Sequence, residues 1–170
     1  MIKVICFFLL ISISGTLLHF TYKLSNKSIV VGIFSSVNES VWEHIKLLLT
    51  PIFFFNTIKY ILGCRNNFFI ALFVELVLSI ILIIVLSNLK VKIFKDKYNY
   101  INIIIFYITA FIVSLTGYVI ENINVCNNVN IMFSIPCLVI FIMYLTFSVF
   151  PPKTKIFLDP ITNTYGINKM

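Results

Sequence analysis

The sequence predicts an all-α protein: a polytopic transmembrane helical bundle of about five spans, with no soluble domain. Of its 170 residues, 60% are hydrophobic and only 11% are charged, and the mean hydropathy is +1.04. A water-soluble domain carries about 25% charged residues, so this chain lacks the polar side chains needed to cover a globule in water. Its apolar runs also reach the roughly 20 residues that one membrane crossing requires.

The net charge of +7 does not indicate a nucleic-acid partner, because the basic residues lie in the gaps between apolar runs. Positive charge in such gaps orients a membrane protein. The expected partner is the lipid bilayer, while a protein partner or homo-oligomer stays unknown. The four cysteines form no CxxC motif. A disulfide between Cys64 and Cys126 is conceivable, and Cys6 and Cys137 are expected to be buried thiols.

The first apolar run predicts a span over residues 2–22. A cleaved signal peptide is the alternative, because Ser12, Ser14 and Gly15 resemble a small-residue cleavage site. The run continues well past Gly15 and is longer than the core of a signal peptide, about 7–15 residues. This length favours a retained membrane helix.

The second predicted span, residues 41–62, begins in the most polar stretch of the chain. The connector before it includes residues 29–34, which we expect at the membrane interface. Pro51 should kink the span, since proline removes one backbone hydrogen bond; an interfacial helix that ends before Pro51 is the alternative. Ser36 is expected to start the helix, because Ser36 and Glu39 fit a capping box; Ser40 with Glu43 is a second option.

A helix rotates by 100° per residue, which places Glu39, Glu43, Lys46, Thr50 and Thr57 on one narrow stripe. His44 then points towards a different neighbour. Carboxylates four residues apart on a helix repel each other, so the stripe needs a shared proton or a cation. Lys46 is positioned to supply that cation.

Three further spans complete a bundle over residues 1–152, and residues 153–170 form a C-terminal tail. In the third span, Glu75 lies about 10 Å from the span's start, where a carboxyl group is expected to be neutral or paired. Glu121 ends the fourth span, and Pro136 kinks or starts the fifth. The expected boundaries are residues 68–86, 101–120 and 131–150.

Basic residues predict the orientation in the cell membrane. The loop at residues 90–97 is the most basic and should be cytoplasmic, whereas the loop after Glu121 has no Lys or Arg and should be external. With five spans, the N-terminus is then outside and the tail is cytoplasmic. In the tail, Asp159, Asn163 and Gly166 are typical of tight turns, the last two because they tolerate positive φ.

Three motifs give the chain a resemblance to a family of small bacterial integral membrane proteins of unknown function. They are Leu18-His19-Phe20-Thr21-Tyr22, the stretch NESVWEHIK at residues 38–46, and FPP with FLDPITNTYGI, which includes Asp159 and Tyr165. The resemblance implies a membrane protein from a Gram-positive bacterium and no known activity. The chain departs from the family pattern at Lys23, where an acidic residue is typical, and at Asn163, where glycine is typical.

Three functions remain open. The favoured one is structural: the motif at residues 38–46 organises the bundle or docks the tail, with Asn38 and Ser40 as caps, Trp42 as an interface anchor, and Glu43 paired with Lys46. Asp159 would then receive His44 or Lys46. The second is binding and transport of a small solute, an ion or a proton, because intramembrane acids such as Glu75 and Glu121 suit a pathway.

The third is an intramembrane metal-dependent hydrolase, with Glu43 and His44 as the candidate catalytic residues. No cofactor motif is evident, and the chain has only two histidines and no HExxH motif. Imidazole and carboxylate ligands nevertheless suit zinc or a similar divalent ion. A metal or proton site would draw on His19, Glu39, Glu43, His44 and Asp159. Overall, the sequence favours a protein that is not an enzyme.

Overall fold

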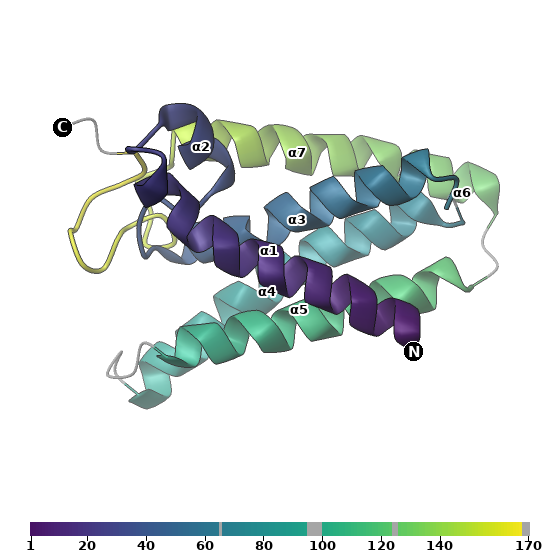
Figure 1. Cartoon of the computed structure of the whole chain (residues 1–170), viewed down its shortest axis with the longest axis horizontal. Helices are drawn as coiled ribbons and strands as arrows, with labels where there is room; N and C mark the ends of the chain where they lie inside the picture. Colours follow the sequence, from purple (N-terminus) through teal and green to yellow (C-terminus); the bar gives the residue numbers. More distant parts are fainter. Residues whose placement is uncertain (65, 95–99, 124–125, 168–170) are drawn as a thin grey trace.

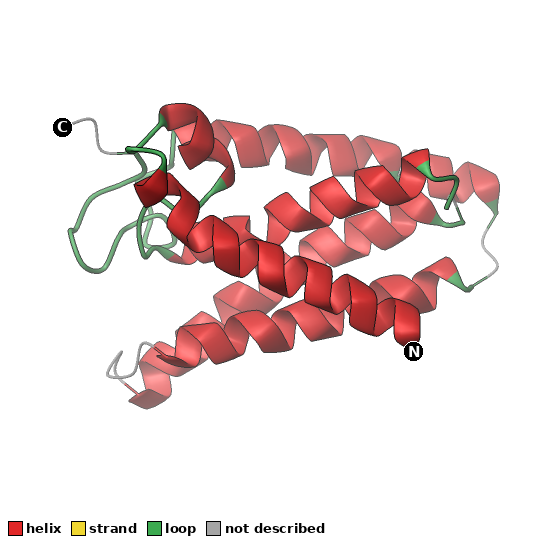
Figure 2. Ribbon diagram, viewed as in Figure 1, coloured by secondary structure: helices red, strands yellow, loops and turns green. Residues whose placement is uncertain are grey.

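The protein folds into a bundle of helices in the computed structural model, which describes residues 1–64, 66–94, 100–123 and 126–167 (Figures 1 and 2). The predicted fold class is therefore confirmed. In chain order the helices are α1 (Ile2–Leu24), α2 (Ile29–Phe34), α3 (Val41–Ile61), α4 (Phe68–Phe94), α5 (Tyr100–Glu121), α6 (Asn127–Met132) and α7 (Ser134–Val149).

The bundle has two distinct ends. Helix α2, the start of α3 and the C-terminal tail gather at one end, which we call the tail end (Figure 1). The start of α1, the end of α3 and α6 lie at the other, which we call the N-terminal end. The start of α1 and the C-terminal tail are thus at opposite ends of the bundle, as an odd number of crossings requires.

Four stretches are long and apolar enough to cross a membrane: α1, α4, α5, and α6 together with α7 (Asn127–Val149). Helix α3 runs between the same two ends (Figure 1) but carries Glu43, Lys46 and Lys59. It packs against α1 and α4, and Ile45, Leu48, Leu49 and Ile52 of α3 are fully buried. The prediction of about five spans therefore corresponds to four apolar helices and a more polar helix, α3, which the apolar helices partly enclose.

Helix α3 continues through Pro51, so the alternative of a helix that ends before this proline is wrong. Pro51 has no N–H, and the carbonyl of Leu47 therefore lacks its usual donor four residues later. Gly15 of α1 lies against this carbonyl: a Cβ at position 15 would be 2.6 Å from the Leu47 oxygen. The absent side chain at Gly15 allows α1 and α3 to cross closely at the proline.

Helix α4 is longer than predicted. It runs to Phe94 instead of ending near residue 86, so Lys90 and Lys92 are helical. Lysine is a good helix former, so these residues do not end the helix. Lys92 is exposed, whereas Lys90 is buried, with 6% of its surface exposed. Residues 95–99 of the predicted basic loop lie outside the described residues.

The last crossing is divided at Phe133 into α6 and α7. Pro136 lies in the first turn of α7, where its missing N–H costs no helical hydrogen bond. Of the two predicted alternatives, a kink or a start at Pro136, the structure is nearer to a start, because α7 begins at Ser134. The Asn130 side chain of α6 accepts hydrogen bonds from the backbone N–H groups of Phe69 and Ile70. Helix α6 thereby caps the start of α4.

The four cysteines are free thiols. Cys64 and Cys126 are exposed and form no disulfide, and Cys137 is buried as expected. Cys6 is exposed rather than buried, because its face of α1 borders a cavity at the N-terminal end of the bundle.

Candidate functional site

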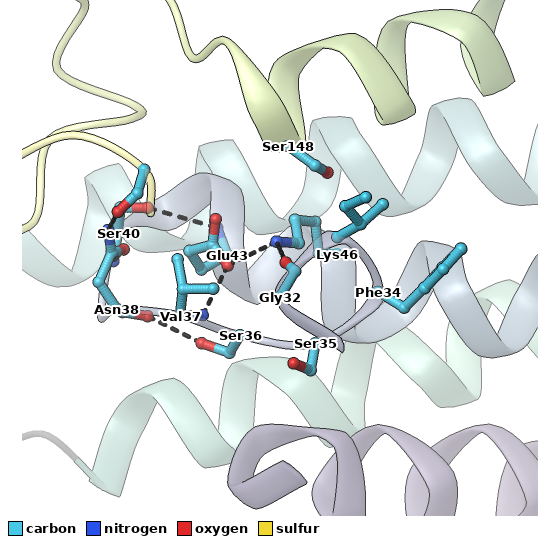
Figure 3. A network of polar contacts seen from close by, with 12 residues as sticks. Gly32, Phe34, Ser35, Ser36, Val37, Asn38, Ser40, Glu43, Lys46 and Ser148 are labelled. Atoms are coloured by element: carbon cyan, nitrogen blue, oxygen red, sulfur yellow. Dashed lines mark hydrogen bonds and ion pairs between the residues drawn. The ribbon is translucent and has the colours of Figure 1, made fainter. Parts of the chain in front are cut away.

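A buried ion pair lies at the centre of the tail end (Figure 3). The Lys46 Nζ atom is 2.9 Å from Oε2 of Glu43, and the two side chains are 0% and 3% exposed. Both groups also bind backbone: the Val37 N–H donates to Oε2 of Glu43 at 2.9 Å, and Lys46 donates to the Gly32 carbonyl at 2.7 Å. Lys46 is therefore the cation that balances Glu43, as predicted.

Side chains from other helices satisfy the carbonyls at the end of α2. Such carbonyls have no donor within their own helix. Three of them accept hydrogen bonds from three different side chains: Gly32 from Lys46 at 2.7 Å, Ile33 from Tyr144 at 3.2 Å, and Phe34 from Thr50 at 2.8 Å. A positive charge at this end also favours the helix dipole. Helix α2 is therefore attached to both α3 and α7.

The predicted helix start at Ser36 is wrong, and Ser40, the second option, caps α3. The helix begins at Val41, and the Ser40 side chain accepts a hydrogen bond from the Glu43 N–H at 3.4 Å. The Asn38 side chain in turn accepts one from the Ser40 N–H at 3.0 Å. The Glu43 carboxylate does not complete the box, because it binds Val37 and Lys46 instead.

The predicted stripe of Glu39, Glu43 and Lys46 is wrong at its first member. Because α3 begins only at Val41, Glu39 does not follow helical geometry. Its carboxylate faces the two histidines, 3.6 Å from His19 Nε2 and 3.8 Å from His44 Nε2. Glu43 turns into the protein instead, so the two acids lie in different surroundings.

The C-terminal tail folds back onto the start of α3. Asp159 accepts hydrogen bonds from the backbone N–H groups of Glu39, Ile161 and Thr162 at 3.2–3.4 Å. Asp159 was predicted to receive His44 or Lys46, but its carboxylate binds these three N–H groups, while Lys46 binds Glu43 and the Gly32 carbonyl. In this turn Asn163 and Gly166 have φ of 55° and 61°, as predicted.

The turn brings the end of the tail to Asn38. Tyr165 pairs with Leu158 in an antiparallel bridge, and the next residue, Gly166, accepts a hydrogen bond from the Asn38 side chain at 3.5 Å. A side chain at Gly166 would meet Pro151 at 2.6 Å. Glycine therefore serves two needs here, positive φ and close contact.

Trp42 lies beneath the tail and is 7% exposed. Its ring centroid is 4.9 Å from that of Phe157 in the tail and 5.6 Å from that of Phe147 in α7. Its backbone N–H donates to the carbonyl of Ile156 at 3.0 Å. The expected interface anchor is thus a buried contact between α3, α7 and the tail, because the tail covers it.

The N-terminal end contains the two remaining candidate acids. Glu75 is 0% exposed and accepts a hydrogen bond from Asn56 at 2.6 Å through Oε2, while its Oε1 has no hydrogen-bond partner. Glu121 ends α5 and pairs with Lys59, with both side chains 25% exposed. Glu121 therefore lies at the rim of the bundle rather than deep in it.

A cavity of about 410 Å³ opens at this end, and Lys59, Glu121 and Ser114 are among its lining residues. Gly117 of α5 makes room for the Glu75 carboxyl group, because a Cβ at position 117 would be 1.8 Å from Oε1. Neither Asn56 nor Gly117 is among the site residues predicted from the sequence. The signal in the sequence that could have identified them is the amide of Asn56 and the small size of Gly117, each inside an apolar run.

The described residues contain no group of three or more His, Cys, Asp and Glu side chains already arranged to hold a metal ion. The structure brings His19, Glu39 and His44 together but directs Glu43 elsewhere. Glu43 is bound to Lys46 and Val37 and does not face His44. The arrangement therefore gives no support to Glu43 and His44 as a catalytic pair.

Long apolar helices and a polar cluster at one end define a multi-pass helical membrane protein. Within this class, the chain belongs to the family of unknown function DUF6512, whose family model matches residues 1–167. The chain matches no curated protein and no solved structure. Membership of the family thus confirms the resemblance and leaves the function to the geometry of the sites.

Proposed function

We propose that the polar cluster at the tail end has a structural function: it holds α2 and the C-terminal tail on the bundle. The observation that carries the proposal is the use of the buried charges. Glu43 and Lys46 bind each other and two backbone groups of the connector, those of Val37 and Gly32. Buried charges that bind each other and the chain's own backbone serve its architecture rather than a substrate.

The tail contacts support the same function. The first N–H groups of a helix have no acceptor within the helix. For Trp42, the second residue of α3, the acceptor is the Ile156 carbonyl of the tail. The Glu39 N–H, just before the helix, is bound by Asp159. The tail thus caps α3 in addition to covering its tryptophan.

The tail end belongs on the cytoplasmic side of a bacterial cell membrane in this proposal. Basic residues favour the cytoplasm, and they are concentrated in the segments that meet at this end: Lys23, Lys27, Lys90, Lys92, Lys153 and Lys155. The N-terminus is then outside and the tail inside. The docked tail presents a cytoplasmic surface next to the membrane.

Asp159→Ala tests the docking. The substitution removes the acceptor for three backbone N–H groups, and we expect it to weaken tail docking by about 1–3 kcal/mol. Trp42, the only tryptophan, should then emit at longer wavelength, because Phe157 leaves its ring. Lys155→Ala, at an exposed tail position, is the control. Unchanged emission in Asp159→Ala would contradict docking.

A second candidate function is the binding and movement of a proton or small cation at Glu75. The specific observation is the buried Oε1 atom without a hydrogen-bond partner. A buried carboxyl oxygen left unsatisfied is costly, and the cost falls when a proton or cation occupies the site. The cavity with Lys59 and Glu121 lies at the same end of the bundle and offers an approach.

Vesicles containing the purified protein test this candidate. Proton or sodium flux should exceed that of empty vesicles, and Glu75→Gln should reduce it to the empty level, because the amide keeps the bond to Asn56 but not the charge. Asp159→Asn, an acid-to-amide change at the tail end, should leave the flux unchanged. Equal flux in empty and protein-containing vesicles would dismiss the candidate.

A further inference from the structure

Two histidines direct the same ring atom at a single carboxylate at the rim of the tail end. His19 comes from α1, His44 from α3, and Glu39 from the segment before α3. The Nε2 atom of His19 is 3.6 Å from one carboxylate oxygen, and the Nε2 atom of His44 is 3.8 Å from the other. The centroids of the two imidazoles are 6.5 Å apart.

The hydrogen bond of His44 defines which ring nitrogen carries the proton. Its Nδ1 is 2.9 Å from the carbonyl oxygen of Ser40, and a carbonyl can only accept, so Nδ1 donates. In the neutral ring Nε2 then presents a lone pair to the carboxylate. Two acceptors that face each other are a repulsive arrangement unless a positive centre lies between them.

The separations suit such a centre better than direct hydrogen bonds. Both exceed the 2.7–3.2 Å or so of a normal N–H···O bond. In a tetrahedral zinc site, with ligands about 2.0–2.1 Å from the metal, neighbouring ligand atoms are about 3.3 Å apart. The observed 3.6 and 3.8 Å are within about half an ångström of that value.

We propose that His19, Glu39 and His44 form a binding site for a divalent ion of the zinc class. Two imidazoles and one carboxylate are an established ligand set for zinc, with a fourth position open to water. The side chains of His19 and Glu39 are 30% and 36% exposed, so an ion can enter. The bond from His44 Nδ1 to a backbone carbonyl is the outer contact that metal-binding histidines typically make.

Binding would draw the side chains together. The two ring centroids, now 6.5 Å apart, have to approach by roughly 1 Å for tetrahedral ligation. Glu39 supplies the negative charge of the site and has to outweigh Lys90, a positive neighbour of His44. An ion in this position ties the end of α1 to the start of α3, next to the contact that Asp159 of the tail makes with the Glu39 N–H.

Calorimetric titration of zinc into the full-length protein, freed of its affinity tag and of chelators in detergent, tests the site. We expect one zinc ion per chain. Substitution of the ligands by amides, in His19→Gln and Glu39→Gln, should weaken binding by more than about tenfold, since the loss of outer contacts alone costs that much. Cobalt in place of zinc should show the visible absorption of a tetrahedral nitrogen and oxygen site.

Glu121→Gln is the matched control, because it removes one carboxylate at the opposite end of the bundle and should leave zinc binding intact. Two ligand variants are used so that one remains informative if the other fails to fold. Absence of one-to-one binding in the native protein would overturn the site, as would equal affinity in folded His19→Gln or Glu39→Gln. Either result leaves the tail docking untouched, since Trp42 emission reports on it without metal.

Discussion

Lys46→Met is expected to lower the free energy of unfolding by about 3–5 kcal/mol, the usual cost of leaving a buried charge without its partner. Lys46 is fully buried and lies 2.9 Å from the equally inaccessible Glu43. Methionine fills a similar volume, so the expected loss comes from electrostatics and from the hydrogen bond to Gly32. Reversible unfolding in mixed detergent micelles measures it.

Two further variants isolate the cause. Adding Glu43→Gln to Lys46→Met removes the second charge, and the double variant should regain at least half of the lost stability, as other buried pairs do when both members are replaced. Lys59→Met, on the same helix but in a pair that is 25% exposed, should cost less than about 1 kcal/mol. A loss in Lys46→Met no larger than that in Lys59→Met would contradict a structural role for the buried pair.

Gly117→Ala is expected to destabilise the bundle by about 1–3 kcal/mol, the typical cost of overpacking. Alanine favours an ordinary helix by about 1 kcal/mol relative to glycine, so intrinsic propensity predicts the opposite sign. The structural reason is the Glu75 carboxyl group, whose Oε1 and Cδ atoms would lie 1.8 and 2.7 Å from the added Cβ. The same unfolding measurement decides the sign.

Changes at Glu75 provide the control for Gly117→Ala. Glu75→Ala in the same chain removes the clashing carboxyl group and should cancel most of the added cost of Gly117→Ala. Glu75→Gln keeps the size of the side chain and should cancel none of it. If both changes at Glu75 relieve the variant equally, charge rather than space is the cause, and the packing explanation fails.

The helical membrane bundle could be predicted from the sequence because it depends on composition and run length, which need no knowledge of packing. The pairing of Glu43 with Lys46 was also within reach, since the two are neighbours on one turn of helix. The place of Glu39 was not, because two serines could start the helix and only the structure shows that Ser40 does. A shift of four residues moved Glu39 from the stripe to the histidines.

Contacts between distant parts of the chain were the least predictable. Tryptophan is a residue type typical of the membrane interface, yet the tail covers Trp42. No local pattern in the sequence places Phe157 against its ring. The close contact between Gly117 of α5 and the Glu75 carboxyl group of α4 is likewise a contact between two helices. The hydrogen bonds from Lys46, Tyr144 and Thr50 to the carbonyls at the end of α2 could not be predicted either, because they form only when the helices are packed together.

Hydrogen exchange at the backbone N–H of Trp42 tests most directly whether the tail is held on the start of α3. This N–H lies in the first turn of α3, and its acceptor is the Ile156 carbonyl of the tail. We predict slow exchange in the native protein in micelles and fast exchange in Asp159→Ala, with Leu49 in mid-helix slow in both. Fast exchange at Trp42 in the native protein, or equal protection in both proteins, would contradict the account.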